Sequence, residues 1–303
     1  MNSIFFLGLV THKASRFPAA ASASGLVNQV SVALNQLGYS TVVRVRSEDE
    51  FESSGVALTK HEILKSIHAE LDLERSWRRY VDPRTSELHL SAEILARKMY
   101  RTLKFAAPWQ AANESTSAGA LMIRRLVNIE LSHIALLKQA HNSGAAWSLI
   151  VEDDAVTDDS VRLAREIADF MSAYTSTSQP KFVNLSRSFS HSTLGIKKHL
   201  TLVGEWGDQS SILQSDRPLT NTVCAILYRG SFLNSLIPAI EQIPISPVLP
   251  IDWKLNAALL NMYRSQRLGA GDCWFTEPAP IVQASMYGLT TDKAWEDGNP
   301  NAV

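Results

Sequence analysis

The sequence predicts an α/β protein with a mostly parallel central sheet flanked by helices. The chain opens with a strand, a loop, a helix and a second strand, and a further apolar strand follows a long helix near the middle. Parallel neighbouring strands need a crossover connection, which places helices on the faces of the sheet. The 303 residues, 45% of them hydrophobic, are enough for one large core.

The opening segment has the pattern of a βαβ unit. Residues 4–10 (IFFLGLV) form a short apolar run that is typical of a buried strand. Apolar residues recur at helical spacing between residues 26 and 37, and Gly38 is well placed to end that helix. Residues 40–45 (STVVRV) are rich in β-branched side chains and predict the second strand.

The rest of the chain continues the alternation of helices and strands. Strands are predicted at residues 147–151, 181–185 and 223–228, and helices at 122–139, 161–171, 231–240 and 253–262. Residues 186–219 are polar and are expected to be irregular, and residues 278–288 are expected to be rich in turns. We therefore expect one domain over residues 1–289, followed by a flexible tail at 290–303.

Residues 54–110 interrupt this alternation and are interpreted as a helical insertion. Helical patterns occur at residues 62–73 and 92–103. The basic residues are either solvated helix faces or a surface for anionic lipid or a phosphate-rich acceptor. Aromatic residues between them are compatible with both interpretations. The basic residues are Arg75, Arg78, Arg79, Arg84, Arg97, Lys98, Arg101 and Lys104.

Composition excludes several classes of protein. A net charge of −1 gives no sign of non-specific nucleic-acid binding. The two cysteines, Cys224 and Cys273, lack the spacing of a zinc site and are expected to be reduced packing residues. The N-terminal apolar run is too short for a signal peptide or a membrane span. We expect a cytoplasmic protein that contacts a membrane, if at all, from its inner surface.

An acidic triplet follows the central apolar strand. Glu152, Asp153 and Asp154 come directly after residues 147–151 (WSLIV). Ligands bind at the carboxyl ends of strands in open α/β sheets, and residues i and i+2 of an extended chain point the same way. Glu152 and Asp154 are therefore expected to share a site suited to Mg²⁺ or Mn²⁺, while Asp153 turns aside. The alternative is a solvated turn before a helix capped by Asp158 or Asp159.

Four stretches in order resemble the family 25 glycosyltransferases, which include lipopolysaccharide galactosyltransferases. They are ELSHIALL at 130–137 with WSLIVEDDAV at 147–156, TNTVCAILYR at 220–229, PIDW at 250–253 and EPAPIVQAS at 277–285. The resemblance covers about residues 122–286 and the first strand. The chain departs from the family's usual opening after the first strand, where it has LVTHKASR at 9–16. The insertion has no counterpart in the resemblance.

The resemblance implies a GT-A-like, Rossmann-type fold and transfer from a nucleotide sugar, with a UDP-sugar favoured. It implies that Glu152 and Asp154 bind Mn²⁺ or Mg²⁺ and that the acceptor is a saccharide or glycolipid, as in cell-surface polysaccharide synthesis. Asp252 is the expected general base, although its place before a helix also suits an N-cap. The donor is expected to contact Thr11, His12, Arg16, Asp153 and Gln283. Further candidates for the site are Ser132, His133, Arg187, His191 and Ser285.

Three other functions predict sequence features that differ from those of the transferase. A nucleotidyltransferase also places carboxylates on Mg²⁺, but residues 11–24 contain none of the glycines of its phosphate loop. A dehydrogenase of the Rossmann class lacks its GxGxxG motif for the same reason. The remaining alternative is a non-catalytic protein, either a degenerate transferase-like binder or a scaffold that docks partners through the basic helices. A scaffold need not bind a metal or a nucleotide sugar, whereas the transferase must.

Overall fold

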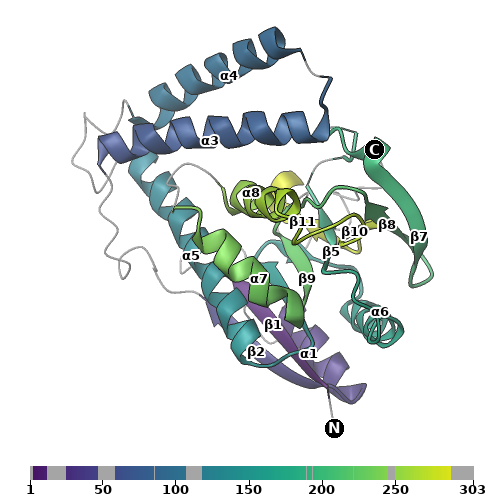
Figure 1. Cartoon of the computed structure of the whole chain (residues 1–303). Coiled ribbons are helices and arrows are strands. Elements are labelled where there is room, and N and C mark those ends of the chain that lie inside the picture. The colour runs from purple at the N-terminus through teal and green to yellow at the C-terminus, as the bar shows by residue number, and fades with distance from the viewer. Residues whose placement is uncertain are drawn as a thin grey trace.

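A computed structural model describes residues 3–11, 25–46, 59–84, 86–106, 118–188, 190–192, 194–220, 222–244 and 250–287. The expected tail at 290–303 lies outside these residues. Within them, the chain folds as an α/β protein around an eight-stranded sheet with the order β2-β1-β3-β9-β5-β10-β8-β7 (Figure 1). The strands are β1 (Ile4–Val10), β2 (Ser40–Arg46), β3 (Trp147–Glu152), β5 (Phe182–Asn184), β7 (Leu200–Trp206), β8 (Ser210–Ser215), β9 (Ala225–Arg229) and β10 (Cys273–Glu277).

The sheet is mixed, so the expectation of a mostly parallel sheet is wrong. β1 pairs in parallel with β2 and β3, and β5 pairs in parallel with β10. β9 lies antiparallel between β3 and β5, and β8 lies antiparallel between β10 and β7. An apolar run indicates that a strand is buried on both faces. It does not indicate the direction of the strand, which depends on how the chain returns to the sheet.

Helices cover both faces of the sheet. One core packs α5 (Ala118–Asn142), α7 (Gly230–Glu241) and α8 (Ile251–Arg264) against side chains such as Phe6 and Ile150. The other core packs α1 (Leu26–Gln36) and α6 (Ser160–Ala173) against the alternate residues, such as Leu7 and Leu149. The period-2 alternation of a strand therefore divides β1 and β3 between two cores, and the fold has three layers.

The stretch expected to be irregular, residues 186–219, contains an edge hairpin. β7 and β8 pair antiparallel with a register irregularity between Leu202 and Gly204. Gly207, in the turn, has a positive φ of 57°, a conformation that favours glycine. Most of β7 is partly or fully exposed, so its sequence lacks the apolar alternation that reveals a half-buried strand. β10 was also missed, because its five residues sit between turn signals.

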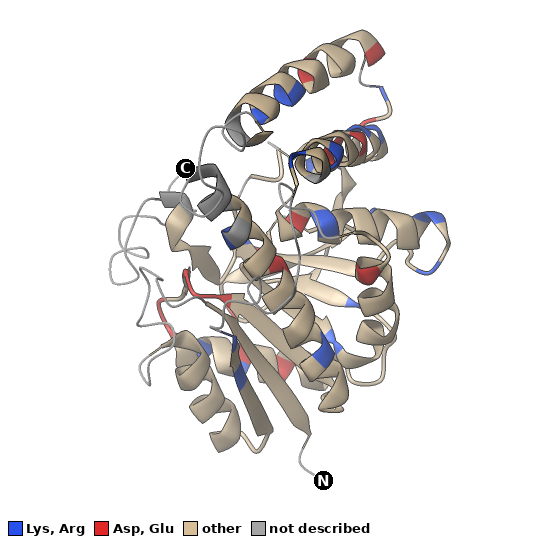
Figure 2. Cartoon of the chain, turned by 90° about the vertical axis from the view of Figure 1, so that its left-hand side faces the viewer, with Lys and Arg blue, Asp and Glu red and all other residues tan. Residues whose placement is uncertain are grey.

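The helical insertion is a hairpin of α3 (Lys60–Val81) and α4 (Glu87–Arg101), which continues as a π-helical turn, η2 (Thr102–Ala106). It has a small core of its own with α5, including Ile63, Ile67 and Leu90. Charges of both signs lie along its two helices (Figure 2). Several of the arginines are used inside the hairpin, in ion pairs that join Arg97 to Glu74, Arg101 to Glu70, Arg78 to Glu93 and Arg79 to Glu87.

Gly230, the first residue of α7, lies against the strand connection at residues 145–146. A Cβ atom at this position would lie 2.0 Å from the carbonyl oxygen of Ala145, and the Gly230 N–H donates to the Ala146 carbonyl at 2.7 Å. Gly230→Ala is expected to lower the free energy of unfolding by about 1–3 kcal/mol, because the backbone must move. Urea denaturation measures this change. The exposed neighbour Ser231 provides the control, Ser231→Ala, and equal stability of the two variants would contradict the prediction.

Candidate metal and donor site

The acidic triplet lies where two parallel strands end side by side. Glu152 is the last residue of β3, and Val10, its partner in the register, is the last residue of β1. Thr11 follows Val10, and its hydroxyl donates to Oδ2 of Asp153 over 3.0 Å. Thr11 and the acidic triplet therefore meet at the carboxyl edge of the sheet. His12 and Arg16 lie outside the described residues.

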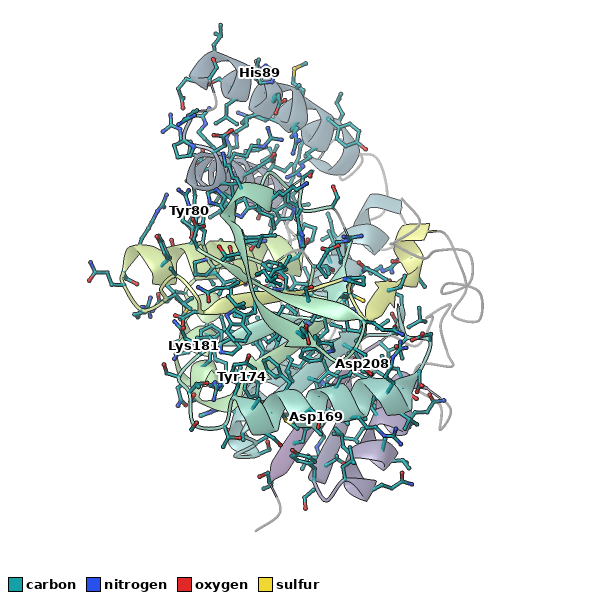
Figure 3. The ribbon with its side chains drawn as sticks, turned by 90° about the vertical axis from the view of Figure 1, so that its right-hand side faces the viewer. Tyr80, His89, Asp169, Tyr174, Lys181 and Asp208 are labelled. Carbon is teal, nitrogen blue, oxygen red and sulfur yellow. The ribbon has the colours of Figure 1, made fainter. Side chains whose placement is uncertain are left out.

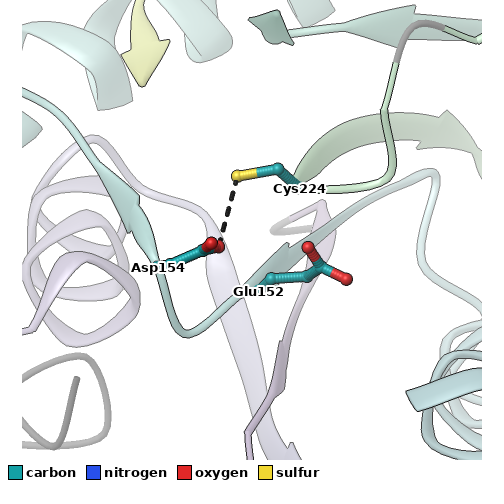
Figure 4. Close-up of side chains that lie close together, drawn as sticks. All are labelled: Glu152, Asp154 and Cys224. Carbon is teal, nitrogen blue, oxygen red and sulfur yellow. Dashed lines mark hydrogen bonds between the residues drawn. The ribbon is translucent and has the colours of Figure 1, made fainter. Parts of the chain in front are cut away.

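Glu152 and Asp154 approach the same point in space. One ligand atom from each of Glu152, Asp154 and Cys224 lies within 4.8 Å of the others, and the Cys224 thiol is 3.8 Å from Oδ1 of Asp154 (Figure 4). Asp153 instead faces Thr11. The strand stops at Glu152 and the chain turns, so a turn rather than a continued strand produces the expected pairing of residues i and i+2.

Neighbouring side chains fix the orientation of both carboxylates. Nε2 of His133, on α5, lies 3.2 Å from Oε1 of Glu152, and the Gln283 amide donates to Oε2 over 3.3 Å. Ser285 donates to Oδ2 of Asp154. His133 is nearly buried, with 3% of its surface exposed. The two carboxylates are therefore oriented by contacts with His133, Gln283 and Ser285. This arrangement is typical of residues that support metal ligands.

Gln283 reaches the acidic cluster through a second, smaller sheet. β11 (Ile281–Gln283) pairs with β4 (Ala155–Val156), directly after the acidic turn, and with β6 (Ser186–Arg187), directly after β5. The amide oxygen of Gln283 accepts from the hydroxyls of Thr222 and Ser188. These bonds leave the amide nitrogen aimed at Glu152. The last turn-rich stretch predicted from the sequence thus contains a strand that builds the site.

The alternative interpretation of the triplet, a solvated turn, does not fit its burial. Only 6% of the Asp154 surface is exposed. Asp159, not Asp154, caps the following helix α6, and its side chain accepts from the N–H groups of Val161 and Arg162 at 2.9 Å. The capping carboxylate and the clustered carboxylates are therefore separate features of this segment.

Burial and the nearby charge of Glu152 together raise the pKa of Asp154 to about 6, against the opposing hydrogen bond from Ser285. A carboxylate whose pKa is raised on folding stabilises the fold below pH 4 and loses this contribution as pH rises through 6. Two carboxylates this close are costly together unless a cation or a proton compensates them.

Asp154→Asn is accordingly expected to stabilise the metal-free protein at pH 8, by about 2–3 kcal/mol from a pKa shift of roughly two units. The difference should shrink toward zero as pH falls below 4, where the aspartic acid is protonated in both states. Denaturation in EDTA at several pH values measures it. The exposed Asp169 supplies the control, Asp169→Asn, and an Asp154→Asn protein less stable than wild type at pH 8 would refute this electrostatic account.

Asp252 belongs to the same electrostatic environment. Its pKa is raised to about 6, chiefly by burial and also by the charge of Glu152. The backbone N–H of Trp253 and the charge of His133 act in the opposite direction. Asp252 is the second residue of α8, and Pro250 occupies the N-cap position. Asp252 is thus not the N-cap residue itself, although its carboxylate accepts from the first turn of the helix.

Two of the remaining candidates, His191 and Arg187, pair with a carboxylate outside the cluster. His191 lies 3.0 Å from Oε2 of Glu277, and Arg187 pairs with the other oxygen of that carboxylate. Ser132 is buried on α5. Cys224 is a free cysteine buried in the core, as expected of a packing residue, and its thiol also lies in the cluster. Its position directly before β9, a strand beside β3, is the signal that could have revealed it.

The donor set fits a divalent cation that prefers oxygen. Two carboxylates converge, their charges repel one another, and hydrogen bonds preset their orientations. The Cys224 thiol is a softer donor, and burial raises its pKa well above the ordinary value, so it is a neutral thiol beside the carboxylates.

A hollow of about 790 Å³ lies elsewhere, near the start of β5. It is lined by residues that include Tyr80, Lys181, Tyr263 and Arg264. Lys181 directly precedes β5, whereas the acidic cluster lies beyond the carboxyl end of that strand. This hollow lacks the convergent carboxylates on which catalysis could be built. We therefore assign the candidate site to the acidic cluster.

No family model matches the chain, and no curated protein matches it either.

Proposed function

We propose that the chain is a nucleotide-sugar glycosyltransferase that moves a sugar to a hydroxyl of a saccharide or glycolipid acceptor with inversion. The observation that carries the proposal is the convergence of Glu152 and Asp154, with Asp252 in electrostatic range, at the carboxyl edge of the sheet. The proposal includes a GT-A-like fold, and the motif resemblance to family 25 glycosyltransferases supports it. A cytoplasmic site of action, in the synthesis of cell-surface polysaccharide, is proposed with it.

Glu152 and Asp154 would hold Mn²⁺ or Mg²⁺. When bound, such an ion would neutralise the diphosphate leaving group of the donor. His133, Gln283 and Ser285 would keep the two carboxylates oriented. Thr11 and Asp153 lie where β1 ends, which is where α/β sheets bind nucleotides, and we assign them with Gln283 to the donor, a UDP-sugar being favoured.

Asp252 would act as the general base. Its carboxylate would accept the proton of the acceptor hydroxyl while that oxygen forms a bond to the anomeric carbon. The bond from the same carbon to the diphosphate oxygen would break on the opposite side, so one displacement inverts the configuration. A pKa of about 6 leaves Asp252 ionised at neutral pH yet more basic than an ordinary aspartate.

Two rival functions make different predictions. A nucleotidyltransferase would bind a nucleoside triphosphate with the same carboxylates and release pyrophosphate. A scaffold would need neither a metal nor a nucleotide. The partial burial of the carboxylates and the hydrogen bonds that they accept from Gln283 and Ser285 favour a site with a ligand over a scaffold surface.

A donor screen by thermal shift tests the proposal. Wild type would be mixed with UDP- and GDP-sugars and with nucleoside triphosphates, each with and without Mn²⁺. A donor at ~100 times its dissociation constant should add ~2.7 kcal/mol to the stability of the protein. We expect a UDP-sugar to stabilise wild type only when Mn²⁺ is present, and Asp154→Asn to lose this effect.

Asp169→Asn, on the exposed surface of α6, is the matched control and should respond like wild type. Stabilisation by a nucleoside triphosphate with pyrophosphate release would replace the proposal by nucleotidyl transfer. A folded wild type that responds to no nucleotide sugar at all would favour the scaffold.

A further inference from the structure

The outer face of the helical hairpin carries an unusual row of apolar side chains. Leu88, Leu95, Met99 and Leu103, here called the outer stripe, are exposed by 83%, 58%, 61% and 67%. Their spacing of seven, four and four residues places them on one side of α4 and its continuation η2. Single exposed leucines are ordinary, but a continuous row of this kind marks an interaction surface.

Folding does not explain the outer stripe, because α4 is held by its opposite side. Leu90 and Ile94 are buried against α3 and α5. Arg97 pairs with the almost fully buried Glu74 of α3. The side chains that hold α4 in place therefore face inward. α4 is the outermost helix in Figure 1, and its residue His89 lies at the edge of the molecule in Figure 3.

The charges near the outer stripe favour an anionic partner. Residues 59–106 contain ten Lys or Arg and seven Asp or Glu. Both acidic residues of α4 are occupied, Glu87 by Arg79 and Glu93 by Arg78. Lys98 lies three residues after Leu95, beside the stripe, and has no ion pair within the described part of the chain.

We propose that the outer stripe docks α4 flat on an anionic phospholipid membrane. The leucine and methionine side chains would enter the boundary between headgroups and acyl chains, while the surplus basic residues would face the anionic headgroups. The contact would be peripheral, because no helix within the described residues is long and apolar enough to cross a membrane. The inference is independent of the reaction at the acidic cluster.

A second copy of the chain is a less suitable occupant. Packing two outer stripes together would bring two hairpins of surplus positive charge face to face, which is unfavourable. A single convex helix also offers no groove to a protein partner, whereas a lipid surface adapts to it. Self-association is therefore treated as an outcome of the test.

Vesicle sedimentation tests the proposal with the full chain. Wild type and the double variant Leu95→Glu/Met99→Glu would be mixed with vesicles of phosphatidylcholine alone or with added phosphatidylglycerol. Wild type should sediment with the phosphatidylglycerol vesicles, less at high salt and little with phosphatidylcholine alone. The double variant should bind at least tenfold more weakly, since it places charge in the apolar stripe.

Leu202→Glu, at a residue of β7 that is 64% exposed, is the matched control and should bind as wild type does. Circular dichroism melting checks that each variant is folded, as expected for exposed positions. Undiminished binding by the double variant, or no binding by wild type, would overturn the proposal. A dimer in light scattering that the double variant abolishes, without vesicle binding, would assign the stripe to self-association instead.

Discussion

Lys254→Met is expected to lower the free energy of unfolding by about 3–5 kcal/mol, because it leaves a buried carboxylate without its cation. Lys254, on α8, pairs with Glu130 of α5, and the two residues are 1% and 0% exposed. The Lys254 ammonium also lies 3.4 Å from the Pro244 carbonyl oxygen. Chemical denaturation of wild type and variant at pH 7 measures the loss.

The double variant Glu130→Leu/Lys254→Met separates the charge from the packing. Removing both charges should recover most of the stability, since a buried ion pair is often replaceable by apolar side chains of similar size. A Lys254→Met protein as stable as wild type would contradict the account. The ion pair between Glu130 and Lys254 also supports the site, because it joins α8 to α5 beside the acidic cluster. Glu130 lies one turn before His133, and Lys254 lies two residues after Asp252.

Asp252→Asn is expected to reduce kcat by about 10²–10⁴-fold while leaving Mn²⁺ and donor binding intact, because it removes only the proton acceptor. The raised pKa of Asp252 predicts a second result, in the pH dependence of the activity. Wild-type activity should increase with pH up to about 6, as the Asp252 carboxyl group loses its proton, and then level off. Single-turnover kinetics with the donor found in the screen measure both effects.

Asp208→Asn, at an exposed position outside the site, controls for the loss of a surface carboxylate. A variant Asp252→Asn with wild-type kcat would remove the residue from the reaction and leave it as a residue of the first turn of α8. A loss of Mn²⁺ affinity in the same variant would instead assign it to the metal site.

The parts of the fold that the sequence predicts correctly are those with a strong local signal. β1, α1, β2 and β3 show apolar runs or helical spacing between clear stop signals, and their observed bounds agree with the prediction to within a residue or two. The acidic triplet could be recognised because three carboxylates crowded at the end of an apolar strand are costly without a counter-charge.

The parts that were missed depend on contacts between distant segments. β9 has the apolar sequence of a parallel strand, but its direction is set by the chain path that brings it between β3 and β5. The hairpin β7–β8 is half exposed and therefore has no clean alternation. Cys224 reaches Asp154 only because β9 is antiparallel to β3, which brings the start of one strand to the end of the other.

In the candidate site, too, the sequence predicts the local features and misses the contacts between distant segments. Spacing along one segment suggested that Glu152 and Asp154 would act together, and they converge. The hydrogen bonds that orient them come from α5 and β11, which are 19 and 131 residues away from Glu152 in sequence. His133 and Gln283 could be suggested by a motif, but no local pattern gives their geometry.

Calorimetric titration of Mn²⁺ into the EDTA-treated protein at pH 7.5 (roughly 1.5 units above the raised pKa of Asp154) tests the central claim most directly. Wild type should bind one Mn²⁺ per chain, and Glu152→Gln and Asp154→Asn should each weaken binding by about tenfold or more, while Asp169→Asn should not. Binding should also weaken as pH falls through 6, because protons compete with the ion for Asp154. No binding by folded wild type, or binding by both site variants that is as tight as that of wild type, would contradict the claim that this cluster is a metal site.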